Sequence, residues 1–151
     1  MTLDYIIFLL PLIIIFSLLI YLQYLSRRVP YEAEISLLIL TNNCQEIIEG
    51  AIKEIKSFCL LYPWCEVIIV DRFSEDDTWK ILFRLAKKNN FRVMQDGPDE
   101  LTAYTAGKKI SSGERLYLLS IDGNSSYPKI KKRLENIKKD AWKQDYYNIV
   151  M

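Results

Sequence analysis

Residues 5–26 form a segment of twenty-two residues without a charged side chain, and Arg27 and Arg28 follow it directly. The segment reads YIIFLLPLIIIFSLLIYLQYLS and offers almost no polar face, which a helix on the surface of a water-soluble domain needs. A bilayer core is crossed by about 20 apolar helical residues. The sequence therefore predicts a transmembrane helix at residues 5–26.

The residues around this segment predict its orientation. Basic side chains near the end of a transmembrane helix usually stay on the cytoplasmic side, and here these are Arg27 and Arg28. Asp4 precedes the segment and no motif of small residues follows it, which disfavours a cleaved secretory signal. We expect a single-pass protein of the cell membrane with its N-terminus outside. A juxtamembrane linker at residues 27–34 would then lead to a cytoplasmic domain at residues 35–151.

Composition limits the chemistry of this domain. The sequence contains no histidine, which excludes Ser-His-Asp and Cys-His catalysis and the commonest zinc ligand. Cys44, Cys59 and Cys65 form no CxxC pair, so we expect small core residues rather than disulfides or zinc ligands. The formal net charge of +1 and the lack of interleaved aromatic and basic residues argue against a nucleic-acid partner.

Short apolar runs alternate with amphipathic segments in the rest of the chain. Strands are predicted at residues 35–40, 67–70, 92–94 and 116–121, with a last edge strand at residues 146–150. Helices are predicted between them, with Asn43 and Ser74 as N-terminal caps of the first two. This alternation is typical of an α/β fold in which helices cover both faces of a mainly parallel sheet.

Polar residues follow three of the predicted strands. In parallel sheets of this kind, ligands bind beyond the carboxyl ends of the strands. We therefore expect one edge of the sheet to carry Thr41, Asn42, Asn43, Asp71, Arg72, Ser120 and Asp122.

The order of these motifs resembles the nucleotide-binding half of family 2 glycosyltransferases, which have the A-type glycosyltransferase fold. Where the family typically has Pro-Thr-Tyr-Asn-Glu, this chain keeps Thr41 and Asn43. Where it has Asp-Asp-Gly-Ser-x-Asp-x-Thr, residues 71–78 read DRFSEDDT. Asp122 stands at the second acid of the family's Asp-x-Asp. The resemblance covers residues 35–122 and implies a truncated, Rossmann-like domain.

The resemblance also implies a binding site. Thr41, Asn43, Asp71 and Ser120 would contact the nucleotide of a nucleotide sugar, and Asp122 would hold Mg²⁺ or Mn²⁺ against the diphosphate. Such ions prefer oxygen ligands from carboxylate and phosphate together. A structural alternative stays open for Asp71, whose carboxylate can instead bind the amides of its own turn.

Several departures from the family pattern argue against activity. Arg72 and Phe73 replace Asp and Gly, Tyr104 stands where an Arg often contacts the donor, and Ser120 removes one acid. Only 29 residues follow Asp122, so we expect the acceptor-binding half and its catalytic base to be missing. We assign no catalytic residue.

These observations lead to three hypotheses about function. The first is a membrane-anchored pseudoenzyme without transferase activity of its own, whose partners besides the lipid bilayer are a nucleotide sugar or another membrane protein. The alternatives are a minimal glycosyltransferase completed by a partner chain, and a structural interaction module without a ligand.

The basic segment at residues 128–143, PKIKKRLENIKKDAWK, has apolar residues at helical spacing. We interpret its basic residues as the solvated outer face of a helix that packs on the sheet. The alternative is a face that contacts anionic lipid headgroups.

Overall fold

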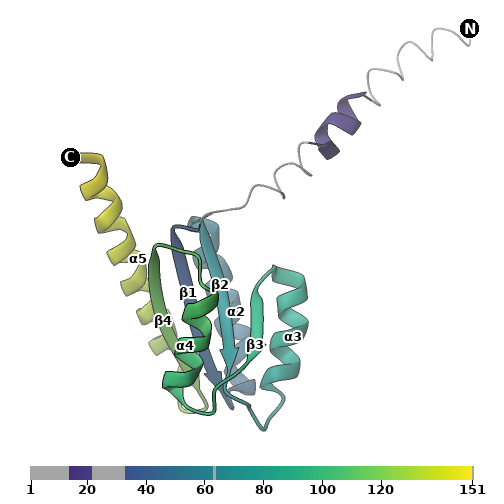
Figure 1. The fold of residues 1–151 in the computed structure, drawn as a ribbon, viewed down its shortest axis with the longest axis vertical. Helices are drawn as coiled ribbons and strands as arrows, with labels where there is room; N and C mark the ends of the chain where they lie inside the picture. Colours follow the sequence, from purple (N-terminus) through teal and green to yellow (C-terminus); the bar gives the residue numbers. More distant parts are fainter. Residues whose placement is uncertain (1–13, 22–32, 63, 151) are drawn as a thin grey trace, which may run out of the picture. The chain divides into compact units, whose positions relative to one another are not determined.

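A computed structural model describes residues 14–21, 33–62 and 64–150, with side chains described as far as Ala141. The chain divides into two compact units, residues 1–31 and 32–151, and only the second contains the sheet (Figure 1). In the first unit, residues 14–21 are helical. Their large apolar side chains are 53–67% exposed.

The predicted transmembrane helix and linker fall largely outside the described residues. Within the part of the chain that is described, no helix combines the length and the apolar character needed to cross a bilayer. The anchor at residues 5–26 therefore stays a prediction.

The second unit is built on a sheet of four parallel strands in the order β3-β2-β1-β4. The strands are β1 (Ile35–Asn42), β2 (Cys65–Asp71), β3 (Arg92–Gln95) and β4 (Arg115–Asp122). The central strand β1 pairs with β2 and with β4. Its residues 37–40 are fully buried, because a central parallel strand is covered on both faces. This explains the continuous apolar run ISLLIL.

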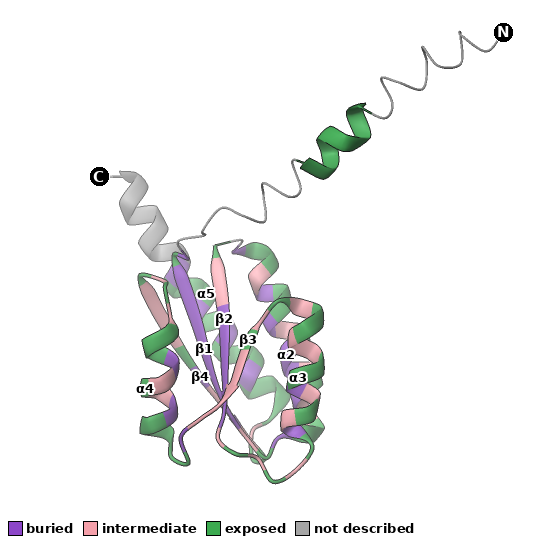
Figure 2. Ribbon diagram, turned by 45° about the vertical axis from the view of Figure 1, so that its right-hand side comes forward, coloured by how far each residue is buried: buried purple, intermediate pink, exposed green. Residues whose placement is uncertain are grey.

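Helices cover both faces of the sheet, as the sequence predicts (Figure 2). The helices are α2 (Gln45–Leu61), α3 (Thr78–Asn89), α4 (Glu100–Ile110) and α5 (Tyr127–Val150). One face packs against α2, α3 and α5 through strand residues such as Leu37 and Ile39. The other packs against α4 through Leu38 and Leu40. Burying each such side chain contributes about 1.5–3 kcal/mol.

The predicted edge strand at residues 146–150 is wrong, because these residues continue α5. Extending an existing helix adds one backbone hydrogen bond per residue, whereas a strand would need a neighbouring strand. The interpretation of the basic segment as the outer face of a packed helix agrees with the structure. Ile130, Leu134, Ile137 and Ala141 are buried against the sheet, while the Lys and Arg side chains of residues 129–139 are exposed.

The two predicted helix caps are also wrong. Cys44 occupies the N-cap position of α2 without a capping side-chain hydrogen bond, and α3 begins at Thr78 after Asp77. Asn43 and Ser74 instead make hydrogen bonds between two loops, described below. By contrast, α4 has a side-chain cap, because Asp99 Oδ1 accepts from the backbone N–H of Thr102 at 3.0 Å.

Candidate functional site at the carboxyl end of the sheet

The carboxyl ends of β1, β2 and β4 bring the predicted polar residues to one edge of the sheet. The strand register places Thr41 beside Asp71 and Asn42 beside Asp122. Asp71 and Asp122 therefore lie at the same edge, two strands apart, with β1 between them.

Asp71 is fully buried, and its carboxylate accepts four hydrogen bonds. Oδ1 accepts from Thr41 Oγ1 at 3.1 Å and from Ser74 Oγ at 2.5 Å. Oδ2 accepts from Ser74 N and from Gln95 Nε2, each at 3.0 Å. A carboxylate has about four acceptor positions, so a nucleotide could bind Asp71 only by displacing one of these partners. The alternative in which Asp71 binds its own turn is the arrangement observed.

The loop after β1 is joined to the loop after β2 by further hydrogen bonds, which we call the loop clasp. Asn43 donates its N–H to Ser74 Oγ at 2.9 Å, and its Oδ1 accepts from Glu75 N at 2.8 Å. Gln45 N donates to Asp76 Oδ2 at 3.1 Å. The clasp holds the two loops in register, and it uses the backbone N–H and the side-chain oxygen of Asn43, a residue that the resemblance assigns to the nucleotide.

Thr78 closes the buried end of the clasp. Its Oγ1 accepts from Cys44 N, and its N–H donates to Asp76 Oδ1, both at 2.9 Å. Burial raises the pKa of Asp76, but hydrogen bonds from Thr78 and Gln45 outweigh it and hold that pKa below its ordinary value. Asp76 is therefore a stable anionic acceptor within the clasp.

Phe73 stands where the resemblance places a glycine, and its backbone φ is +51°. This left-handed conformation costs about 1–2 kcal/mol in a residue with a side chain. The ring of Phe73 is 55% exposed. The hydrogen bonds of the adjacent Ser74 to Asp71 hold the turn in this conformation.

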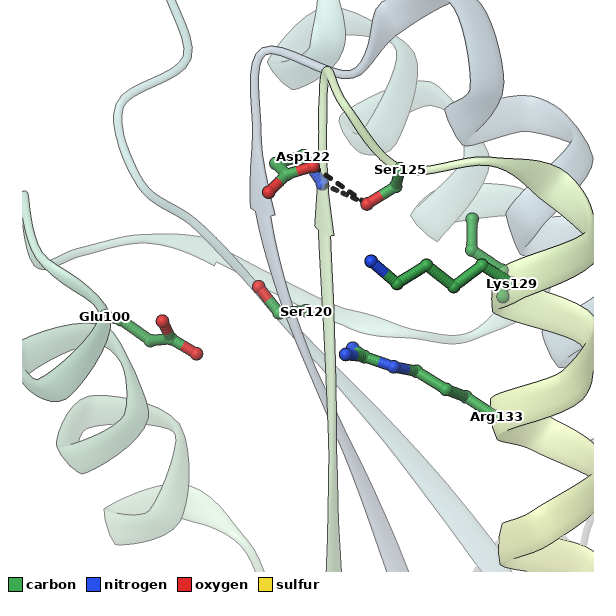
Figure 3. Close-up of a pocket in the computed structure, with 7 residues that line it drawn as sticks. Glu100, Ser120, Asp122, Ser125, Lys129 and Arg133 are labelled. Carbon is green, nitrogen blue, oxygen red and sulfur yellow. Dashed lines mark hydrogen bonds between the residues drawn. The ribbon is translucent and has the colours of Figure 1, made fainter.

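A cavity of about 220 Å³ lies at the carboxyl end of β4, between α4 and α5 (Figure 3). Ser120 and Asp122 are the two predicted site residues that line it. The full lining consists of Glu100, Ser120, Asp122, Ser125, Lys129, Ile130 and Arg133. The structure thus separates the predicted residues, because Thr41, Asn43 and Asp71 are not part of this lining. Asn43 contributes to a second cavity of about 230 Å³ at the start of α2.

One oxygen of Asp122 is held by its own turn. Oδ1 accepts from Asn124 N at 3.0 Å and from Ser125 Oγ at 2.9 Å. Among the described residues, Oδ2 has no hydrogen-bond partner. The turn therefore orients the carboxylate and leaves one oxygen available to a ligand.

Lys129 and Arg133 extend from α5 toward Ser120 and Asp122, and Glu100 of α4 lies on the other side of the cavity (Figure 3). Neither basic side chain forms a hydrogen bond or an ion pair with a described residue. Sequence reasoning missed both as site residues. The available signal was their spacing of four residues, which places them on one helix face shortly after Asp122.

The side chains of this cavity offer few ligands to a divalent metal. Among the described residues, no three His, Cys, Asp or Glu side chains cluster as metal ligands. Ser120 supplies no carboxylate at the position of the first acid, which leaves Asp122 as the one acid of that motif. Mg²⁺ is usually held by one or two carboxylates together with phosphate oxygens. The predicted role of Asp122 as a metal ligand stays a prediction.

Comparison with known families agrees with this architecture. Residues 36–146, well over half of the chain, match the family model described as Glycosyl transferase family 2. The chain belongs to glycosyl transferase family 2. The resemblance inferred from the strand-end motifs is thereby confirmed. No curated protein matches the chain.

Solved structures with a similar fold include TarS of S. aureus. The crystal structure of TarS 1-349 matches with a TM-score of 0.51 and 23% identity, over 76% of this chain and 33% of TarS 1-349. The same fragment in complex with UDP-GlcNAc matches with a TM-score of 0.51 and 23% identity, over 76% of this chain and 32% of the fragment. This chain therefore matches about a third of those chains, and the likeness shows a shared fold.

Proposed function

We propose that this family 2 glycosyltransferase domain binds a nucleotide sugar at the carboxyl end of its sheet and does not transfer the sugar on its own. The observation that carries the proposal is the cavity beside Asp122. There the Ser120 hydroxyl lies with one carboxylate oxygen and two cationic side chains that have no partner among the described residues, at the edge where parallel α/β sheets bind ligands.

The size of the cavity indicates which part of the ligand it holds. Its volume is about 220 Å³, below the roughly 300–1,000 Å³ typical of small-molecule sites. It is suited to the diphosphate and the adjoining part of the sugar. The nucleoside would then lie along the same edge, toward Thr41, Asn43 and Asp71. TarS 1-349, part of which has this fold, has a crystal structure in complex with UDP-GlcNAc, which makes UDP-GlcNAc a rational first ligand to test.

Departures from the family pattern support inactivity of the chain by itself. Ser120 replaces an acid, and Phe73 adds a bulky ring at a glycine position. Asp71 is fully occupied by protein hydrogen bonds. Transfer with inversion also needs a base that takes the proton of the acceptor hydroxyl, and we assign no described residue to that role.

We further propose that residues 5–26 anchor the domain in the cell membrane as a single span, with the domain in the cytoplasm. The support is the uncharged apolar sequence and the two arginines that follow it. The described part of the segment, residues 14–21, is helical and exposes its apolar side chains.

Ligand binding is tested by thermal unfolding of the full chain in detergent, with UDP or UDP-GlcNAc at millimolar concentration. A ligand present at 100 times its Kd stabilises the folded state by about 2.7 kcal/mol, which raises Tm by several degrees. Asp122→Ala should reduce the shift that UDP-GlcNAc produces, while Asp140→Ala, at an exposed position of α5 outside the cavity, should keep it. An unchanged Tm with both ligands would contradict the proposal. Release of UDP from UDP-GlcNAc by the purified chain would contradict its inactivity.

A further inference from the structure

We infer that Lys129 and Arg133, rather than a divalent metal ion, neutralise the diphosphate in the cavity beside Asp122. The inference rests on the proposed function, because it assumes that the cavity receives a nucleoside diphosphate. It concerns how this chain holds that ligand where Ser120 replaces one of the two acids of the family's motif and no cluster of three metal ligands occurs among the described residues.

The charges of the two side chains match the requirement. Together Lys129 and Arg133 carry two formal positive charges, as many as one Mg²⁺ or Mn²⁺ ion. The guanidinium of an arginine can bind two phosphate oxygens at once, and a lysine ammonium acts as a compact charge. Both side chains line the same cavity as Ser120 and Asp122, so the compensating charge lies at the end of β4.

The positions of the two cations are set by the core. Ile130 lies next to Lys129 in α5, and Leu134 lies next to Arg133; both apolar side chains are buried against the sheet. This packing fixes the rotation of α5 about its axis. Residues 129 and 133 are one turn apart and therefore share a face, and Figure 3 shows both side chains directed toward Ser120 and Asp122.

Both cations are available to a ligand. Glu100 and Asp122 line the same cavity, yet neither forms an ion pair with Lys129 or Arg133 among the described residues. A phosphate can therefore bind Lys129 and Arg133 without first breaking a salt bridge to a described residue.

The acidic side chains of the cavity fit the sugar rather than the phosphates. Glu100 lies across the cavity from Lys129 and Arg133 (Figure 3), and Asp122 Oδ2 has no described partner. Ionised carboxylates accept hydrogen bonds and would repel phosphate, but they can accept hydrogen bonds from hydroxyl groups. A ligand with an anionic part and a hydroxyl-rich part matches this division of charge.

The test measures UDP binding to the full chain in detergent by isothermal titration calorimetry, once with excess EDTA and once with Mn²⁺. We expect the Kd in EDTA to lie within about threefold of the Kd in Mn²⁺. Lys129→Gln and Arg133→Gln should each weaken UDP binding about tenfold, the loss expected for a hydrogen bond to a charged group. The matched controls Lys131→Gln and Lys132→Gln remove the same charge from exposed positions of α5 outside the cavity and should change Kd less than twofold.

The outcomes separate this inference from the proposed function. Binding that disappears in EDTA and returns with Mn²⁺ would overturn the inference and keep the proposed function. UDP binding in EDTA whose Kd is unchanged by Lys129→Gln and by Arg133→Gln would also overturn it. No UDP binding under either condition would overturn the proposed function, and the inference with it.

Discussion

At the scale of single residues, the motif that the chain shares with its family acts largely within the protein. Asp71 and Ser74 belong to the DRFSEDDT stretch, and both take part in the hydrogen bonds that join the loops after β1 and β2. A motif match can therefore reflect the shape of the edge as much as contact with a ligand. A residue that shapes the edge should destabilise the fold when it is replaced, whereas a residue that only contacts a ligand should not.

Asp71→Asn tests the structural role. The substitution places an NH₂ group at one of the two carboxylate oxygens, each of which accepts two hydrogen bonds. It also removes the negative charge that strengthens all four hydrogen bonds, so we expect the free energy of unfolding to fall by about 1–3 kcal/mol. Chemical denaturation followed by circular dichroism measures the change, with Asp140→Asn on the exposed side of α5 as the control. Unchanged stability would contradict a structural role for Asp71.

The buried thiol of Cys44 should make the stability of the domain fall at alkaline pH. The thiol is 2% exposed, and burial raises its pKa from 9.0 to about 11. The unfolded chain loses this proton near pH 9 while the folded chain keeps it. The neutral Cys44 thiol therefore makes its full contribution to the free energy of unfolding below pH 9. This contribution is lost as pH rises toward 11, by at most about 1.4 kcal/mol per pH unit.

The measurement compares the free energy of unfolding of the native chain and Cys44→Ala from pH 8 to pH 10.5. We expect the variant to show the shallower decline, because it lacks this titrating group while Cys59 and Cys65 are still present. Parallel declines in the two proteins would contradict the prediction.

At the scale of elements, the sequence predicted the strands more accurately than the starts of the helices. The apolar run at residues 35–40 lies within β1, because burial on both faces imposes a continuous apolar sequence. The run at residues 116–121 lies within the edge strand β4, where Leu119 and Ile121 are buried and Leu118 is 43% exposed. The start of α3 was predicted too early, since Ser74 donates to Asp71 instead of capping the helix. That partner is close only in the folded chain, so local sequence could not reveal it.

The cavity was predictable only in part for a similar reason. Ser120 and Asp122 follow from the position of β4, because the carboxyl ends of parallel strands meet at one edge. The contribution of Lys129 and Arg133 depends on how α5 is rotated on the sheet, which the buried face of α5 decides. The helical spacing of the basic segment was visible in the sequence, but the cavity its side chains face was not.

Replacing glycine by alanine should change the free energy of unfolding in opposite directions at two helix positions. A Cβ at Gly107 of α4 would lie 2.3 Å from Cδ1 of Leu38, which is fully buried in β1. Crowding a packed core typically costs about 1–3 kcal/mol, more than the roughly 1 kcal/mol that alanine gains over glycine in a helix. We therefore expect Gly107→Ala to lower the free energy of unfolding.

Gly50→Ala is the matched comparison in α2. There a Cβ would lie 3.3 Å from Cε2 of Tyr127, a partly exposed ring that can move aside. We expect this variant to be stabilised by up to about 1 kcal/mol. Thermal unfolding of both variants measures the two signs, and a destabilisation of similar size in both would contradict the close packing of α4 on β1.

At the scale of the whole molecule, the chain combines an apolar N-terminal segment with a glycosyl transferase family 2 domain that matches about a third of TarS 1-349. Residues 32–151 form a compact unit with its own core. Residues 27–31, between the predicted span and this unit, reach at most about 18 Å when fully extended. If residues 5–26 cross the bilayer, the domain must therefore act close to the membrane surface.

The orientation of the chain in the membrane gives the last prediction. Arg27 and Arg28 should keep the domain in the cytoplasm.

The native cysteines are unsuitable as probes, because Cys44 is buried and Cys59 and Cys65 are only partly exposed. We therefore replace all three by alanine and introduce Thr2→Cys or Lys132→Cys, the second at an exposed position of α5. A membrane-impermeant maleimide should label the cysteine at position 2 in intact cells and the cysteine at position 132 only after permeabilisation. The reverse pattern would refute the orientation, and identical labelling of both positions would refute a single span between them.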